Sequence, residues 1–269
     1  MPKRSPKKKK PKHVILRRRP EKPFPFMDLP PELRDMIYEM AFTDVNGISL
    51  ETRTKAYRRT VCRAPMFDSD ECLYSWRRHP NANHTPKDGA QDFAPKVRDL
   101  VPNLLAVSKQ IHNEAVDILY GQDFIFRDTD ALHRFLAIIG LRNQKRLRSI
   151  DIKSFCMGRN SKTLNHCAFM SLAAATNLKT LRLNNDEFRY HANAKAFARG
   201  IYRDAHHFLE AYGIANGRRD AAIDIMQLDD DVFDSFSPYR RRGDVTKLPT
   251  AEDNRVIFRK ELCRLLARV

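Results

Sequence analysis

Two pairs of residues have the chemical types needed for catalysis or metal binding, but their spacing argues against both roles. His112 and Glu114 lie two residues apart, and no second histidine follows at the spacing of a zinc-binding helix, so a pair on a helix surface is predicted. His166 and Cys167 have the types of a nucleophile and its base. Adjacent residues on a helix point about 100° apart, which favours partly buried helix residues instead.

Two further groups have residue types that bind cations. Asp229, Asp230 and Asp231 are consecutive and lack the glycine-turned loop of a calcium site, so a solvated acidic turn is predicted. The nine glycines form no phosphate-binding, dinucleotide-binding or nucleophile-elbow motif. We therefore expect no catalytic residue, no metal site and no cofactor, and a protein that is not an enzyme. The second group of possible cation ligands has separations that fit no closed Cys/His zinc motif. It consists of Cys62, Cys72, His79 and His84.

Positive charge is concentrated at the start of the chain. Of the net charge of +16, +10 lies in residues 1–22, which contain eleven Lys or Arg and one Glu. Residues 1–23 have too little apolar surface to offset their chain entropy, so a disordered basic tail is predicted. Two basic clusters in the tail suit the acidic grooves of nuclear import receptors, and non-specific contact with nucleic acid is the alternative. The clusters are Lys7, Lys8, Lys9, Lys10 and Lys12, and Arg17, Arg18 and Arg19.

The composition also bears on the cellular compartment. The five cysteines are widely spaced and include no Cys-x-x-Cys pair, as expected of reduced thiols inside a cell. No stretch approaches the roughly 18 consecutive apolar residues that cross a bilayer, and the first residues are not an apolar signal core. We expect a soluble protein that is nuclear or nucleocytoplasmic and has no membrane partner.

Apolar residues recur with helical spacing in several segments. Leu33, Met36, Ile37, Met40 and Ala41 form one stripe after Pro30-Pro31. Further helices are predicted at 101–120, 129–139 and 164–176, and a longer one carries apolar residues from Phe197 to Tyr212. Glycines at 121, 140 and 213 are expected to end three of these helices. A last helix is predicted to begin at a capping-box variant formed by Thr250 and Asp253.

Two segments form a weak internal repeat. Residues 147–152 and 178–183 share the pattern Leu, basic, hydroxyl, apolar, polar, apolar, and each alternates as a half-buried strand does. Residues 124–126 and 223–228 are further strand candidates. Strands that alternate with helices imply right-handed crossovers and neighbouring parallel strands.

The segment Phe26–Tyr38 resembles the opening of an F-box, and Leu104–Ala115 is similar to the segment that follows in the F-box-like proteins of filamentous fungi. The resemblance covers roughly residues 24–45 and 100–150, and more faintly the repeats to residue 183. It implies helices that pack on a Skp-type adaptor and present a bound protein target to a cullin ubiquitin ligase. The residues that the resemblance assigns to the adaptor contact are Leu29, Pro30, Leu33, Ile37, Tyr38, Leu105, Val107 and Ile111.

Other interpretations of the same residues stay open. About sixty residues separate the two blocks, and Ile111-His112 stands where many F-boxes carry Trp, which leaves room for a degenerate F-box. The chain would then be a nuclear DNA- or RNA-associated protein that binds through its basic tail. A further interpretation is that the apolar stripes bind no partner and pack only against the core of the chain itself.

The expected fold class is α+β leaning to α/β. F-box-like helices precede irregular leucine-rich-like strand–helix repeats with a short, mostly parallel sheet. Three parts are predicted: the basic tail at 1–23, a helical module at 24–122 with an insertion at about 43–99, and the strand–helix region at 123–269 with its C-terminal helix.

Overall fold

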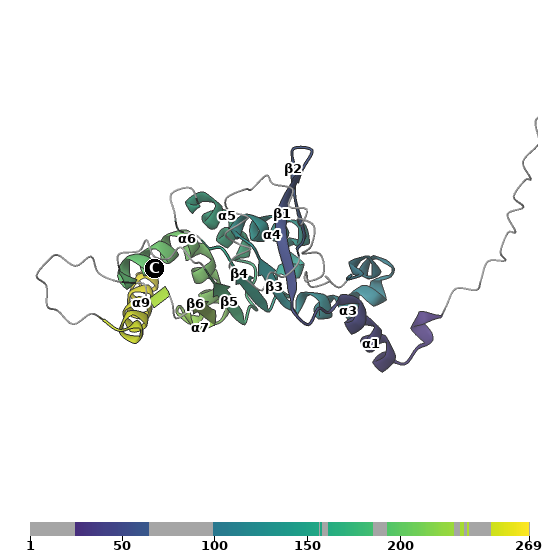
Figure 1. The fold of residues 1–269 in the computed structure, drawn as a ribbon. Coiled ribbons are helices and arrows are strands. Elements are labelled where there is room, and N and C mark those ends of the chain that lie inside the picture. The colour runs from purple at the N-terminus through teal and green to yellow at the C-terminus, as the bar shows by residue number, and fades with distance from the viewer. Residues whose placement is uncertain are drawn as a thin grey trace, which may run out of the picture.

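The computed structural model describes residues 25–64, 99–155, 157, 161–184, 193–228, 232–233, 236 and 249–268 (Figure 1). These residues form a six-stranded sheet, a layer of helices against one of its faces, and a helical unit at the β1 and β3 end. The N-terminal helical unit, as we call it, consists of η1 (Phe26–Asp28), α1 (Pro31–Phe42), η2 (Pro102–Ala106) and α3 (Lys109–Tyr120).

The sheet combines one hairpin with a parallel series. Strands β1 (Ile48–Lys55) and β2 (Arg58–Arg63) are antiparallel. Strand β1 is followed in space by β3 (Asp123–Phe126), β4 (Ser149–Ile152), β5 (Thr180–Leu183) and β6 (Met226–Leu228), all parallel. The predicted α+β to α/β fold with a mostly parallel sheet is confirmed.

The helices lie together because of the strand order. From β3 onward each connection moves the chain to the next strand in one direction, and right-handed crossovers then place the connecting helices on one face. Figure 1 shows this layer, which consists of α4 (Thr129–Gln144), α5 (Lys162–Leu172) and α6 (Ala194–Ala215), each packed on the next. None of the described helices has the length and apolar character needed to cross a membrane.

The core forms between this layer and alternate side chains of the strands. One buried row joins Ile48, Phe124, Ile150 and Leu181 across four strands, and a second row lies two residues further along each strand. Phe135 of α4 contacts the rings of Phe124 and Phe126, so both rows face the helices. The two strands predicted from the repeated pattern are confirmed, because residues 149–152 and 180–183 form β4 and β5, which are paired neighbours.

Three sequence predictions about element boundaries were wrong. Residues 48–63 are not part of an insertion in a helical module, since they form the β1–β2 hairpin of the sheet. Residues 101–120 are not one helix, because the Ser108 hydroxyl accepts from Ile111 N–H and caps a new helix there. Of residues 223–228, only the last three form a strand, after α7 (Ala221–Ile225). A further prediction is confirmed: the helix that begins at Thr129 is interrupted at Gly140, whose φ of 72° and ψ of 167° are not helical, and a second short helical segment follows within α4.

A hydrogen-bonded polar chain crosses the helix layer. Thr129 Oγ1 donates to Asn165 Oδ1 (3.0 Å), and Asn165 Nδ2 donates to Asp204 Oδ2 (3.1 Å), which links α4, α5 and α6. All three side chains are buried, and Arg203 also donates to Asp204. Sliding one helix along its neighbour would leave buried polar atoms without partners, so this chain sets the helix register.

The C-terminal helix α9 (Ala251–Leu266) packs on α6. Its predicted capping box is confirmed, with Thr250 and Asp253 each bonding the backbone N–H of the other. Glu261 of α9 accepts from Arg199 of α6 at 2.8 Å and from Arg264. Hydrogen bonds from Arg264 and then Arg199 lower the pKa of Glu261 to about 2.

Replacing Asn165 with leucine should destabilise the fold, because a side chain of similar size would leave Thr129 and one oxygen of Asp204 without a partner. The expected loss in the free energy of unfolding is about 1–3 kcal/mol in urea denaturation. Lys162→Leu, at an exposed position of the same helix, is the matched control and should change little. Equal effects of the two variants would contradict the role assigned to the polar chain.

Replacing Glu261 with glutamine should change the response to acid. A lowered pKa in the folded state means that the carboxylate stabilises the protein above its ordinary pKa of 4.5, and that this contribution disappears as the pH falls toward 2. Glu261→Gln should therefore be less stable than the wild type at pH 6, and the gap should narrow at pH 2.5. Urea unfolding at both pH values measures this, and a gap independent of pH would refute it.

Candidate protein-docking surface

Helix α1 buries one face and exposes an apolar one. Tyr38 and Phe42 are completely buried, whereas the exposed fractions are 45% for Leu33 and 56% for both Met36 and Met40. The sequence placed the apolar stripe correctly on one side of the helix. That side faces solvent, nearly opposite the buried side.

Neighbouring segments add apolar surface. The backbone N–H of Val101 donates to Ala41 O (3.0 Å), so the exposed Val101 side chain adjoins the C-terminal end of α1. Val107, at the junction of η2 and α3, is also exposed. We use the name α1 face for Leu33, Met36, Ile37 and Met40, with Val101 at its end.

A polar clamp determines which face of α1 is buried. Arg34 donates to both carboxylate oxygens of Glu114 on α3, at 3.1 Å each, and Tyr38 Oη donates to Glu114 Oε2 at 2.9 Å. The guanidinium of Arg34 also donates to the carbonyl oxygens of Met27 and Leu29. One arginine therefore holds the segment around η1, helix α1 and helix α3 together, and the α1 face is left outward.

The clamp shifts the pKa values of both groups that meet at its centre. Burial and the hydrogen bond to Glu114 raise the pKa of Tyr38 to about 12. Hydrogen bonds from Tyr38, Gln110 and Arg34 lower the pKa of Glu114. Both directions favour the protonated phenol beside the ionised carboxylate, which is the pairing that the structure contains.

The spacing of the α1 face matches a known mode of protein recognition. Leu33, Met36, Ile37 and Met40 stand at i, i+3, i+4 and i+7, the anchor positions of a helix that fills an apolar groove. Single exposed apolar residues are common, but several at this spacing on one helix indicate a binding surface. The two methionines suit such a surface because their side chains adapt to an irregular partner.

The structure exposes some of the residues predicted to contact an adaptor and buries others. Leu33, Pro30 and Val107 are exposed, and Leu29, Ile37 and Leu105 are half-buried. Tyr38 and Ile111 are buried in the core of the chain itself and do not belong to the exposed surface. Met36 and Met40 belong to it but were not proposed as contacts, although their helical spacing is visible in the sequence. The basic clusters at 7–12 and 17–19 lie outside the described residues, as do Cys72, His79, His84 and Asp229–Asp231.

Other chemical groups do not converge on a reaction centre. His166 lies against the rings of His206 and His207, with centroids 5.6 and 5.3 Å away. Among the residues with described positions, no three His, Cys, Asp or Glu side chains are placed to hold a metal ion. Burial raises the pKa of the Cys62 and Cys263 thiols, which lowers their thiolate fraction and hence their reactivity.

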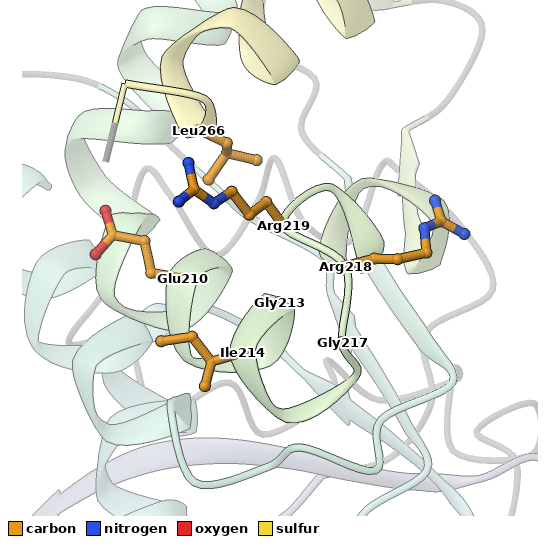
Figure 2. A pocket seen from close by; sticks show the side chains of 7 residues that line it. All are labelled: Glu210, Gly213, Ile214, Gly217, Arg218, Arg219 and Leu266. Atoms are coloured by element: carbon orange, nitrogen blue, oxygen red, sulfur yellow. The ribbon is translucent and has the colours of Figure 1, made fainter.

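A hollow of about 340 Å³ lies between the end of α6 and the last turn of α9 (Figure 2). Arg219 extends toward Leu266 across it, whereas Arg218 points away and pairs with Asp220 and Asp224. Glu210 accepts from Tyr202. No Ser, Cys or His is found among the described residues that line the hollow. Its lining consists of Glu210, Gly213, Ile214, Gly217, Arg218, Arg219 and Leu266.

Replacing Tyr38 with phenylalanine should weaken the clamp and keep the ring that packs on Phe26 and Phe42. The lost hydrogen bond should lower the Tm by about 2–4 °C at pH 7. A raised pKa in the folded state means that the Tyr38 contribution is present below pH 10 and is lost as the pH rises toward 12. The difference in Tm between wild type and variant should therefore shrink between pH 9 and pH 12 in thermal melts, and a constant difference would exclude the clamp.

Comparison with known proteins identifies a family. A scan against protein-family models matches residues 19–164 to a domain of unknown function, DUF7730. No curated protein and no solved structure matches the chain. The matched segment includes the N-terminal helical unit, the hairpin and strands β3 and β4. Because this match covers more than half of the 269 residues, the chain belongs to the DUF7730 family.

Proposed function

We propose that this chain is a non-catalytic protein-interaction adaptor that binds a Skp-type subunit of a cullin ubiquitin ligase through the α1 face. The observation that carries the proposal is the solvent exposure of Leu33, Met36 and Met40 on a helix whose other face is buried. An apolar helix face of this kind loses its contact with water when it enters an apolar groove, which drives binding.

The exposure of this face weighs against self-packing as the only role of the stripe. If the stripe existed to fill the core of the chain, its members would be buried. Tyr38 and Phe42 fill the core from α1 instead, and the clamp from Glu114 keeps them there. A rigidly held helix also loses less entropy on binding, so the clamp favours affinity as well as orientation.

The choice of partner rests on the F-box resemblance of the two blocks around η1–α1 and η2–α3. These blocks are separate in sequence, and they pack on each other in the N-terminal helical unit. Within the resemblance, Leu29, Pro30 and Leu33 stand at positions that face the adaptor. Pro30 and Leu33 are exposed and Leu29 is half-buried beside them, which is consistent with that assignment.

The target would bind elsewhere, on the face of the sheet opposite the helix layer. Alternation along the strands places Asp151, Arg182 and Gln227 on that face, where Arg182 and Gln227 are exposed and Asp151 is buried beneath them. Arg182 donates to Gln227 at 2.9 Å, and Asp151 accepts from Asn184 at 3.0 Å. Such a polar surface suits recognition by hydrogen bonds. This chain would then act by raising the effective concentration of the target at the ligase, and it would make or break no bond itself.

Replacing Leu33 and Met36 with aspartate should abolish adaptor binding, since the two charges would be buried in an apolar groove. We expect at least a 30-fold loss of affinity for a purified Skp-type adaptor, measured by calorimetry or pull-down with the full chain. Ile214→Asp is the matched control, because Ile214 is an exposed apolar residue at the far end of the sheet, and it should bind like the wild type. Equal binding by both variants, each shown to be folded by circular dichroism, would rule out docking through the α1 face.

A further inference from the structure

The β1–β2 hairpin extends beyond the sheet that anchors it. Strand β1 pairs with β3 only over Ile48–Leu50, whereas its pairing with β2 continues to Lys55 opposite Arg58. Residues 53–60 are all exposed. Figure 1 shows the tip of the hairpin standing clear of the neighbouring ribbons. The outer half of the hairpin is therefore a two-stranded ribbon, and no third strand of the described part of the chain lies beside it.

This ribbon carries only positive charge. Residues 53–60 contain four Lys or Arg and no Asp or Glu. Arg53 pairs with Glu51 at 2.7 Å and Arg59 with Asp130 at 3.6 Å, both partners lying outside the ribbon. Among the described residues, Lys55 and Arg58 have no acidic partner, although they stand directly opposite each other. Like charges in directly opposed positions destabilise a strand pair, so an anion bound between them would relieve a repulsion.

The tip of the ribbon presents an aromatic ring in an unfavourable backbone conformation. Ala56 and Tyr57 form a two-residue turn with φ values of 47° and 64°, the left-handed region that Gly and Asn favour in such turns. The Tyr57 side chain is fully exposed. A large ring at this position adds backbone strain and gains no packing in return. The Tyr57 ring therefore does not stabilise the folded chain, which points to a role in contact with another molecule.

Two cations beside an exposed ring match the chemistry of a nucleic-acid strand. Phosphates bind Lys and Arg, and any base offers a flat face on which tyrosine stacks. An acidic peptide would use the cations but would leave the ring without a specific partner. We propose that the β1–β2 hairpin binds single-stranded nucleic acid, with Lys55 and Arg58 on the phosphates and Tyr57 stacked on an unpaired base. This site is independent of the α1 face and of the basic tail.

Removing the ring tests the proposal most directly. Tyr57→Gly should fold as well as the wild type or better, because glycine accepts a positive φ without strain. With the full chain and a fluorescently labelled 20-nucleotide oligouridine RNA, fluorescence anisotropy should show a Kd about tenfold higher for Tyr57→Gly than for the wild type. Tyr57→Phe retains the stacking face and should stay within about twofold of the wild type.

The charges are tested by a matched pair of double variants. Lys55→Gln with Arg58→Gln should weaken binding and reduce the slope of log Kd against log salt by about 1.4, the effect of two lost phosphate contacts on a single strand. Arg142→Gln with Lys145→Gln removes the same charge from exposed positions on α4 and its C-cap and should lower affinity less. The basic tail is present in every variant, so its contribution cancels in these comparisons.

Four results would overturn the proposal. Equal affinities for wild type and Tyr57→Gly would exclude stacking. If the two double variants lose affinity equally, the binding is a general charge effect and not a property of the hairpin. Tighter binding to a 20-base-pair duplex than to the single strand would exclude the assignment to unpaired bases, and competition by polyglutamate without any effect of Tyr57→Gly would identify an acidic protein as the partner instead.

Discussion

Strands β1 and β3 pair over only three residues each, Ile48–Leu50 beside Phe124–Phe126, and much of the molecule depends on this short contact. The strands are parallel and each follows a helix, so α1 and α3 arrive side by side at the same edge of the sheet. Gln122 joins the two helix–strand connections, since its Nε2 donates to Phe42 O and its Oε1 accepts from Asp44 N–H. Only in this arrangement does the Glu114 carboxylate reach α1.

The same contact separates the two surfaces proposed to bind partners. On the helical side it brings α3 to α1, and the clamp then turns Leu33, Met36 and Met40 outward. On the other side, β3 ends as β1 continues, which leaves the outer hairpin as a free ribbon. The adaptor surface is apolar and the hairpin is basic. The two therefore suit partners of different chemistry, and a variant of one surface should leave the other intact.

Polar contacts between helices determine the orientation of the packed elements. Burial of apolar side chains drives association, but it tolerates rotation and sliding of a helix. The Thr129–Asn165–Asp204 chain and the Arg34–Glu114–Tyr38 clamp do not, because each displaced group would lose a charged or buried partner. Each of these contacts joins residues at least 36 positions apart in sequence.

The sequence by itself determined the elements whose signals are local. Alternation over six residues predicted β4 and β5, and the Thr250–Asp253 pair predicted the start of α9, since strand faces and helix caps involve residues within a few positions of one another. It also located the stripe on α1. Only the tertiary structure decided that this stripe is exposed and that Tyr38 is buried, because that outcome depends on Glu114, which lies 76 positions away from Tyr38. The hairpin was missed for a related reason: its outer half has no buried side, and the apolar periodicity that predicts a strand arises from burial.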